Sequence, residues 1–282
     1  MKAEQPGRAG EPSYADMAEP VKRKVACVVQ VLLAITLCVL GGQQSTAQVA
    51  ATRQPVLVEL FTSEGCSDCP PADALLALLD ATQFVPGVDA IVLSEHVTYW
   101  DRQGWRDPFS LQEMTDRQAQ YVARFGLKSA YTPQMVVDGG TQFVGNNPHA
   151  LSQALEAAGR TKKLLLMIED ARWTGRSVRF AVRGQANPNV QLTAALAEDA
   201  TRSEVKRGEN AGRTLHHVAV VRAMKDFGTH AMDGRTLELH GSGMSADASA
   251  DAPVRLVVFL TDRNTGRVEA VAEQTLKRSS GT

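Results

Sequence analysis

The sequence predicts an α/β domain with the element order β-α-β-α-β-β-α, followed by an all-β, sandwich-like domain. Up to residue 159, apolar runs typical of strands alternate with helical patterns. Beyond that residue, strand-like runs follow one another with turn signals and no long helical pattern between them. The chain has 282 residues and is 44% hydrophobic, which is enough for one large core or two modest ones.

The elements of the first half follow from local pattern. Apolar, β-branched runs predict strands, and apolar residues at helical spacing predict helices. Asp-Gly-Gly at 138–140 is a hairpin signal, and Pro148 suits the first turn of a helix. Strands are predicted at residues 55–61, 88–94, 131–137 and 141–144, and helices at 71–81, 111–125 and 148–158.

The second half contains seven strand-like runs with turn signals such as Asn-Pro-Asn and Asn-Thr-Gly between them. Strands are predicted at residues 163–169, 177–183, 190–197, 214–223, 236–240, 255–261 and 268–274. We therefore divide the mature chain into an α/β domain at 55–159, a sandwich-like domain at 160–276 and a tail at 277–282.

The N-terminus resembles an export signal. Lys22-Arg23-Lys24 precede an apolar run at 25–40, and small residues follow up to Ala47. The apolar run is shorter than the roughly 20 residues that span a membrane. We expect residues 1–47 to be a cleaved signal peptide, read from Met1 or Met17, and 48–54 to be a linker. The protein would then be exported, periplasmic or secreted, with no stable membrane span after cleavage.

Cleavage would remove two of the four cysteines and leave Cys66 and Cys69, in the stretch Cys-Ser-Asp-Cys. A structural bridge would enclose too small a loop to restrict the unfolded chain much. A closed zinc site needs two further ligands, and the histidines are scattered, although a Cys₂His copper site remains an alternative. A redox pair fits the position, because a helix N-terminus after a strand stabilises a thiolate. Pro70-Pro71 predict that the helix begins at or just after Cys69.

The cysteine pair after a strand, with Tyr131-Thr132-Pro133 opening a later strand, resembles the thioredoxin superfamily. The stretches VELFTSEGCSDCPPADALL, HVTYWDRQGWRDPF, YTPQMVVDG and GENAGRTLHHVAVVRAM are similar to a secreted, thioredoxin-like family called domain of unknown function 1223. The resemblance implies a cis-proline at Pro133 that faces the redox pair. It implies a thioredoxin-like fold for residues 55–159 and no defined activity.

Two polar clusters accompany the cysteines. The first follows the second strand, at the sheet edge where α/β proteins place their sites. It is expected to be a substrate loop or a structural loop, and His96 could accept a thiol proton. The second would face the cysteines or form a network between domains. The first comprises His96, Tyr99, Trp100, Asp101 and Trp105, with Thr132 at the start of the third strand as a further candidate, and the second comprises Glu209, Asn210, Arg213 and His217.

These observations predict an exported thiol–disulfide oxidoreductase-like protein in which Cys66 attacks, Cys69 resolves and Pro133 shapes the substrate groove. Its partner would be a protein or peptide that carries a thiol or disulfide. We assign no cofactor and no metal, and the formal charge of −1 argues against nucleic-acid binding. The alternative is a non-enzymatic periplasmic protein that binds a ligand or metal on the same scaffold.

Overall fold

The computed structural model describes residues 53–185, 188–229, 231–241, 244 and 253–277. The predicted signal segment and residues 278–282 lie outside this part. Within it, no helix is both long and apolar enough to span a membrane. The elements are β1 (Gln54–Thr62), α2 (Pro70–Thr82), β2 (Val88–His96), α3 (Gln112–Arg124), β3 (Gln134–Val137), β4 (Thr141–Val144), α4 (Pro148–Gly159), β5 (Leu166–Thr174), β6 (Ser177–Gly184), β7 (Val190–Glu204), β8 (Thr214–Gly228), β9 (Asp233–His240), β10 (Pro253–Asp262) and β11 (Val268–Lys277).

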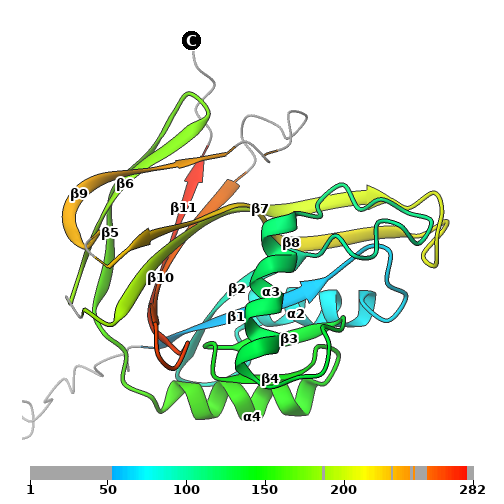
Figure 1. Cartoon of the computed structure of the whole chain (residues 1–282), viewed down its shortest axis with the longest axis horizontal. Coiled ribbons are helices and arrows are strands. Elements are labelled where there is room, and N and C mark those ends of the chain that lie inside the picture. The colour runs from blue at the N-terminus through cyan, green and yellow to red at the C-terminus, as the bar shows by residue number, and fades with distance from the viewer. Residues whose placement is uncertain (1–52, 186–187, 230, 242–243, 245–252, 278–282) are drawn as a thin grey trace, which may run out of the picture. The chain divides into compact units, whose positions relative to one another are not determined.

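The fold is mixed α/β, with a large sheet and few helices (Figure 1). Among the described residues, eight strands form one sheet in the order β11-β10-β7-β8-β2-β1-β3-β4, and β5-β6-β9 form a second sheet. Strand β1 pairs in parallel with β2 and antiparallel with β3. Strand β2 meets β8 at Ser94 and Val220. One sheet therefore runs through both halves of the chain.

Opposite faces of β1 carry different helices. Arg117 of α3 bonds to Glu59, and the ring of Phe61 packs edge-on against Tyr121 of α3. Leu60 lies between Glu59 and Phe61 in the sequence, and its side chain points to the other face. It lies next to Gly145, just before α4, together with Ala72 of α2. Because strand side chains alternate between faces, α3 covers one face and α2 and α4 cover the other.

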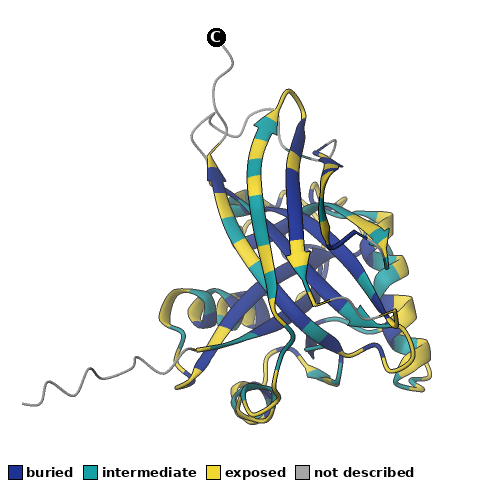
Figure 2. Ribbon diagram, turned by 90° about the vertical axis from the view of Figure 1, so that its left-hand side faces the viewer, coloured by how far each residue is buried: buried dark blue, intermediate teal, exposed yellow. Residues whose placement is uncertain are grey.

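Strands β7 and β10 bury both of their faces. Figure 2 shows that buried strands run through the middle of the molecule. Alternate residues of these strands belong to two cores, one under the helices and one under the small sheet. The helix-side residues are Ala195, Ala197, Val257 and Phe259, and the residues facing the small sheet include Leu192, Ala194, Leu196, Leu256, Val258 and Leu260.

The predicted order of the first seven elements and the seven later strands is observed. The boundary at residue 159 stays a prediction, although the shared sheet crosses it. The largest difference lies in β7 and β8, which we expected to occupy 190–197 and 214–223 and which each have 15 residues. Their polar ends continue as a two-stranded ribbon, because residues 198–204 pair with 214–220. The sequence pattern did not predict this pairing, because these strand ends are mostly polar and show no apolar alternation.

Replacing Phe259 with alanine should lower the free energy of unfolding by about 3–5 kcal/mol, because this side chain is 0% exposed in the shared core. Urea denaturation measures the change. Leu165→Ala is the control, since Leu165 is 70% exposed and should cost less than about 0.5 kcal/mol. Equal small losses in both variants would contradict a shared, well-packed core.

Candidate functional site: a covered disulfide

Cys66 and Cys69 form a disulfide between β1 and α2, with their α-carbons 5.4 Å apart. Cys69 is the N-cap residue of α2, and its carbonyl oxygen accepts hydrogen bonds from the N–H groups of Ala72 and Asp73. The helix begins at Pro70, so the expected start directly after Cys69 is confirmed. Proline fits the first turn of a helix because its missing N–H would have no partner there.

The disulfide is covered by the hairpin tip, residues 205–213, which joins β7 to β8. Cys66 is 1% exposed and Cys69 is 0% exposed. Asn210 is itself buried and donates to the carbonyl oxygens of Glu64 at 2.8 Å and Cys66 at 2.9 Å. The N–H of Ser67 donates to Glu209 Oε2 at 3.0 Å, and the side chain and N–H of Ser67 together lower the pKa of Glu209. A partner's thiol cannot reach the sulfur atoms while the hairpin tip is in place.

The hairpin tip is braced on its other side by the loop that contains Trp105. Gly208 has φ +79°, and a β-carbon there would lie 3.1 Å from the β-carbon of Trp105. A β-carbon on Gly104 would lie 3.2 Å from the Gly208 α-carbon. Both glycines are thus required by close backbone approach. Arg213 donates to Asn210 Oδ1 at 3.0 Å and so orients the amide toward Cys66.

A buried set of polar side chains, the Glu64 network, surrounds Glu64, which lies two residues before Cys66. Its members are Glu64, Asp73, Trp105, Ser203 and His217. Glu64 Oε2 accepts from Trp105 Nε1 at 2.8 Å and from Ser203 Oγ at 3.1 Å, and Oε1 lies 3.3 Å from His217 Nε2. His217 Nδ1 lies 3.7 Å from Asp73 Oδ2. These contacts compensate the cost of burying a carboxylate.

Two acidic side chains favour the protonated form of the His217 imidazole. Burial alone lowers the pKa of His217, but Asp73 and Glu64 outweigh burial and raise it to about 10. The positive charge therefore sits between two carboxylates, one just before Cys66 and one in the first turn of α2. A buried charge of this kind persists only because it is paired.

His96 joins the network through ring contacts. Its Nδ1 lies 2.7 Å from Asp107 Oδ2, and its ring meets that of His217 edge-on at 4.6 Å between centroids. Burial raises the pKa of Asp107, but His96 and the N–H groups of Glu64 and Phe109 together bring it below its usual value. The Nδ1 atom is thus held by a carboxylate, while Nε2 has no hydrogen-bond partner in the described part of the chain. Its expected role as a thiol proton acceptor stays a prediction.

The two tryptophans of the first cluster bracket the disulfide loop. Trp100 Nε1 donates to Thr132 Oγ1 at 2.7 Å, and its β-carbon lies 3.1 Å from the position of a β-carbon on Gly65. The Thr132–Pro133 bond is cis, as the resemblance implied, and the Pro133 carbonyl accepts the N–H of Gly145 at 2.9 Å. Through its hydrogen bond with Trp100, Thr132 is connected to the loop that precedes Cys66.

The remaining predicted residues have more local contacts. Asp101 accepts from the Asp107 N–H and from Ser110 Oγ, which braces the loop between β2 and α3. Tyr99 packs with Phe61, Val97 and Tyr121, and burial raises its pKa to about 12. Asp101 and Tyr99 therefore support the loop between β2 and α3. In contrast, Trp105 and His217 contact the Glu64 carboxyl group, and Asn210 contacts the Glu64 carbonyl oxygen.

Sequence reasoning did not select Glu64, Asp73, Asp107 or Ser203. An acidic residue at the end of an apolar strand, two positions before a cysteine, was the available signal for Glu64. Asp73 looked like an ordinary acidic residue of a first helical turn. Its role depends on His217, which lies 144 positions away in the numbering and contacts it only after folding. No group of three or more potential ligands in the described residues has the geometry to hold a metal ion.

Comparisons with known proteins give a family and a fold. A family model described as Protein of unknown function (DUF1223) matches residues 57–261. The chain is similar to a crystal structure of a protein from Agrobacterium tumefaciens, with 23% identity and a TM-score of 0.59. The likeness covers 82% of this chain and 97% of that one, and at this identity it shows the fold alone. No curated protein matches the chain.

The raised pKa of His217 predicts a pH dependence of stability. A group whose pKa is raised on folding stabilises the protein fully below its ordinary pKa of about 6.5, and this contribution is lost as pH rises toward about 10. His217→Gln should therefore be destabilised most at pH 6, and its stability should approach that of the wild type near pH 10. Urea unfolding across this range measures the gap.

His216→Gln is the matched control for this experiment, because His216 is the exposed neighbour on the same strand. It should leave the pH profile unchanged. A gap between wild type and His217→Gln that is constant with pH would contradict a buried, protonated His217.

Proposed function

The chain belongs to the DUF1223 protein family, and we propose that it acts as an exported thiol–disulfide oxidoreductase-like protein through Cys66 and Cys69. A thioredoxin-like arrangement of residues 55–159 is part of this proposal. It is supported by the order β1-α2-β2-α3-β3-β4-α4 and by the parallel β1–β2 and antiparallel β1–β3 pairings. The partner is a protein or peptide with thiol or disulfide groups.

The observation that carries the proposal is the position of the disulfide between an ionisable network and a helix N-terminus. A bridge across two intervening residues adds little chain restriction, so stability does not explain it. The N-terminus of α2 favours negative charge on sulfur, and the Glu64 network keeps a proton at His217 close to the same turn. Buried ionisable groups of this kind gather at functional sites.

The proposed reaction with a dithiol partner has two steps. A partner thiolate attacks the Cys66 sulfur, the Cys66–Cys69 bond breaks, and Cys69 receives the electron pair and a proton. A second partner thiolate then attacks the partner's own sulfur in the mixed disulfide, and Cys66 leaves and is protonated. Two partner thiols become a disulfide, the protein's disulfide becomes two thiols, and both protons pass from partner to protein. The same steps in reverse reduce a partner's disulfide.

In this proposal the Glu64 network acts on Cys69 through its charges. Asp73 and Cys69 lie in the same turn, since the Asp73 N–H donates to the Cys69 carbonyl at 3.1 Å. Protonated His217 contacts Asp73 on one side and Glu64 on the other. Protonated His217 would offset the charge of these carboxylates beside the Cys69 thiolate, and the proton that reaches this thiolate is the one that the partner thiol released.

Both cysteines are buried and the hairpin tip is bonded to the loop that contains Cys66, so we infer that the hairpin tip moves before reaction. Two hydrogen bonds from Asn210 and one to Glu209 hold the hairpin tip on the disulfide loop. At about 1 kcal/mol each, they would limit the exposed state to a small fraction of molecules. An incoming polypeptide that replaces these hydrogen bonds would therefore be favoured over a small thiol.

The near-complete burial of Cys66 favours a second candidate function, a non-enzymatic binding protein in which the disulfide holds the loop beneath the hairpin tip. In that case neither reduction nor Cys66→Ser would abolish ligand binding. Thiol exchange would also stay at background after the hairpin tip is loosened. The experiments below separate the two functions on these grounds.

Cys66→Ser should abolish turnover of insulin disulfides in the presence of dithiothreitol, because the attacking sulfur is lost. Cys69→Ser should instead accumulate a mixed disulfide at Cys66, since the resolving sulfur is absent. Mass spectrometry of non-reduced samples detects this adduct. If neither the wild type nor a variant with a loosened hairpin tip exceeds the rate of free dithiothreitol, the oxidoreductase function is wrong.

Asn210→Ala should accelerate reduction of the Cys66–Cys69 disulfide by about 10- to 30-fold, because two neutral hydrogen bonds are worth about 2 kcal/mol. The rate is measured by alkylation of the released thiols after timed exposure to dithiothreitol. Asn264→Ala, at an exposed turn position between β10 and β11, is the control and should not change it. An unchanged rate in Asn210→Ala would mean that the hairpin tip is not the barrier.

A further inference from the structure

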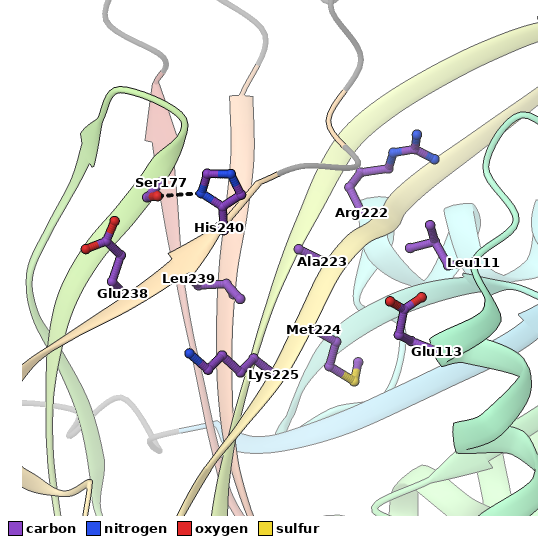
Figure 3. Close-up of a pocket in the computed structure, with 10 residues that line it drawn as sticks. All are labelled: Leu111, Glu113, Ser177, Arg222, Ala223, Met224, Lys225, Glu238, Leu239 and His240. Carbon is purple, nitrogen blue, oxygen red and sulfur yellow. Dashed lines mark hydrogen bonds between the residues drawn. The ribbon is translucent and has the colours of Figure 1, made fainter.

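We propose that the groove between β8 and β9, the β8–β9 groove, binds an extended polypeptide that adds a strand to the edge of β9. This inference goes beyond the proposed function and does not rest on redox activity. The groove has a volume of about 570 Å³. Its lining residues are Leu111, Glu113, Ser177, Arg222, Ala223, Met224, Lys225, Glu238, Leu239 and His240, as drawn in Figure 3.

The β8–β9 groove arises because two consecutive strands do not pair. Strand β8 ends at Gly228 and β9 begins at Asp233, a separation typical of a hairpin. Strand β9 instead joins β6 in the small sheet, while β8 stays beside β7 in the large sheet. The two strands therefore diverge from their short connection, and among the described residues no strand takes the place that each would give to a hairpin partner.

Each wall of the β8–β9 groove is a strand edge. In the described part of the chain, β9 pairs with β6 alone. Strand β8 pairs with β7 along one edge, and along its other edge it pairs with β2 at Val220 alone. Four consecutive residues of β8, 222–225, and three of β9, 238–240, line the groove. Successive strand side chains point to opposite faces, so a groove lined by consecutive residues follows the backbone edge and not one face.

An extended polypeptide is the ligand that matches such an edge. Alternate residues of an edge strand direct N–H and C=O groups outward, and an added strand satisfies them with its own backbone. The eight residues of β9 offer enough length for this pairing. A small molecule could satisfy only a few of these groups.

The floor of the β8–β9 groove suits a strand with alternating apolar side chains. Leu111 and Met224 pack against the helix-side core, and Leu239 belongs to the core under the small sheet. Exposed Lys225 and Glu238 stand on opposite walls, so the rim carries both signs of charge. Apolar residues at every second position of a ligand would face the floor, and polar residues would face the rim.

The test uses fluorescein-labelled, reduced and carboxymethylated α-lactalbumin, an unfolded polypeptide with no free thiol, and measures binding by fluorescence anisotropy. Lys225→Trp and Glu238→Trp fill the β8–β9 groove from opposite walls, at exposed positions that tolerate a large side chain. Each should weaken binding at least 10-fold. Lys277→Trp, on the outer strand β11, is the matched control and should bind like the wild type.

Hydrogen exchange localises the probe. Binding should protect amides of residues 233–240 in the wild type and not in the filled variants. Absence of probe binding to the wild type would overturn the proposal, as would equal binding by the filled variants or loss of binding in Lys277→Trp. Concentration-dependent dimerisation of the wild type that Lys225→Trp abolishes would also overturn it, because the occupant would then be a second copy of this chain.

Discussion

Burial of both faces of β7 and β10 is the constraint on which the rest of the structure depends. Each strand contributes alternate side chains to the core under the helices and to the core under the small sheet. Separating the halves would expose apolar surface on both sides, so one sheet must run through the chain. Strand β8 is then fixed between β7 and β2. The ribbon formed by its N-terminal residues and the end of β7 extends to the disulfide. Contacts such as that between Glu64 and His217, which are 153 residues apart, follow from this arrangement.

The structure contains two buried groups of charged side chains, which differ in their surroundings. On the face covered by α3, Arg117 bonds to Glu59 and lies against the rings of Tyr121 and Phe259, which joins the helix to both halves of the sheet. Burial and the nearby Glu59 raise the pKa of Glu95 well above its usual value. Beside the disulfide, by contrast, a histidine with a pKa of about 10 lies between two carboxylates. The first group has the character of a structural ion pair, whereas the second places an ionisable histidine and two carboxylates next to the turn that holds Cys69.

Strand β8 connects the two surfaces to which we assign roles. Its first residues carry the hairpin tip over Cys66, and its last residues form one wall of the β8–β9 groove. Arg222, which lines the groove, lies over the ring of Phe109, and this ring in turn contacts His217. The covered disulfide and the open strand edge are thus linked by one strand and one layer of packed rings. A protein that recognises a polypeptide before it exchanges thiols would need such an arrangement of a covered reactive site and an accessible binding edge.

The sequence by itself determined the elements and the central pair of residues. Apolar periodicity placed the strands and helices, and Pro70-Pro71 after Cys69 fixed the start of α2, because these are local effects of backbone sterics and side-chain alternation. Only the tertiary structure decided that β7 and β8 extend as a ribbon, that Asn210 covers Cys66, and that Glu64 and Asp73 share the charge of His217. The ribbon depends on pairing between two polar strand ends, and the other two features depend on contacts between residues more than a hundred positions apart. Polar residues in such contacts have the same local pattern as polar residues on a solvated surface, so no periodicity marks them before the sheet has formed.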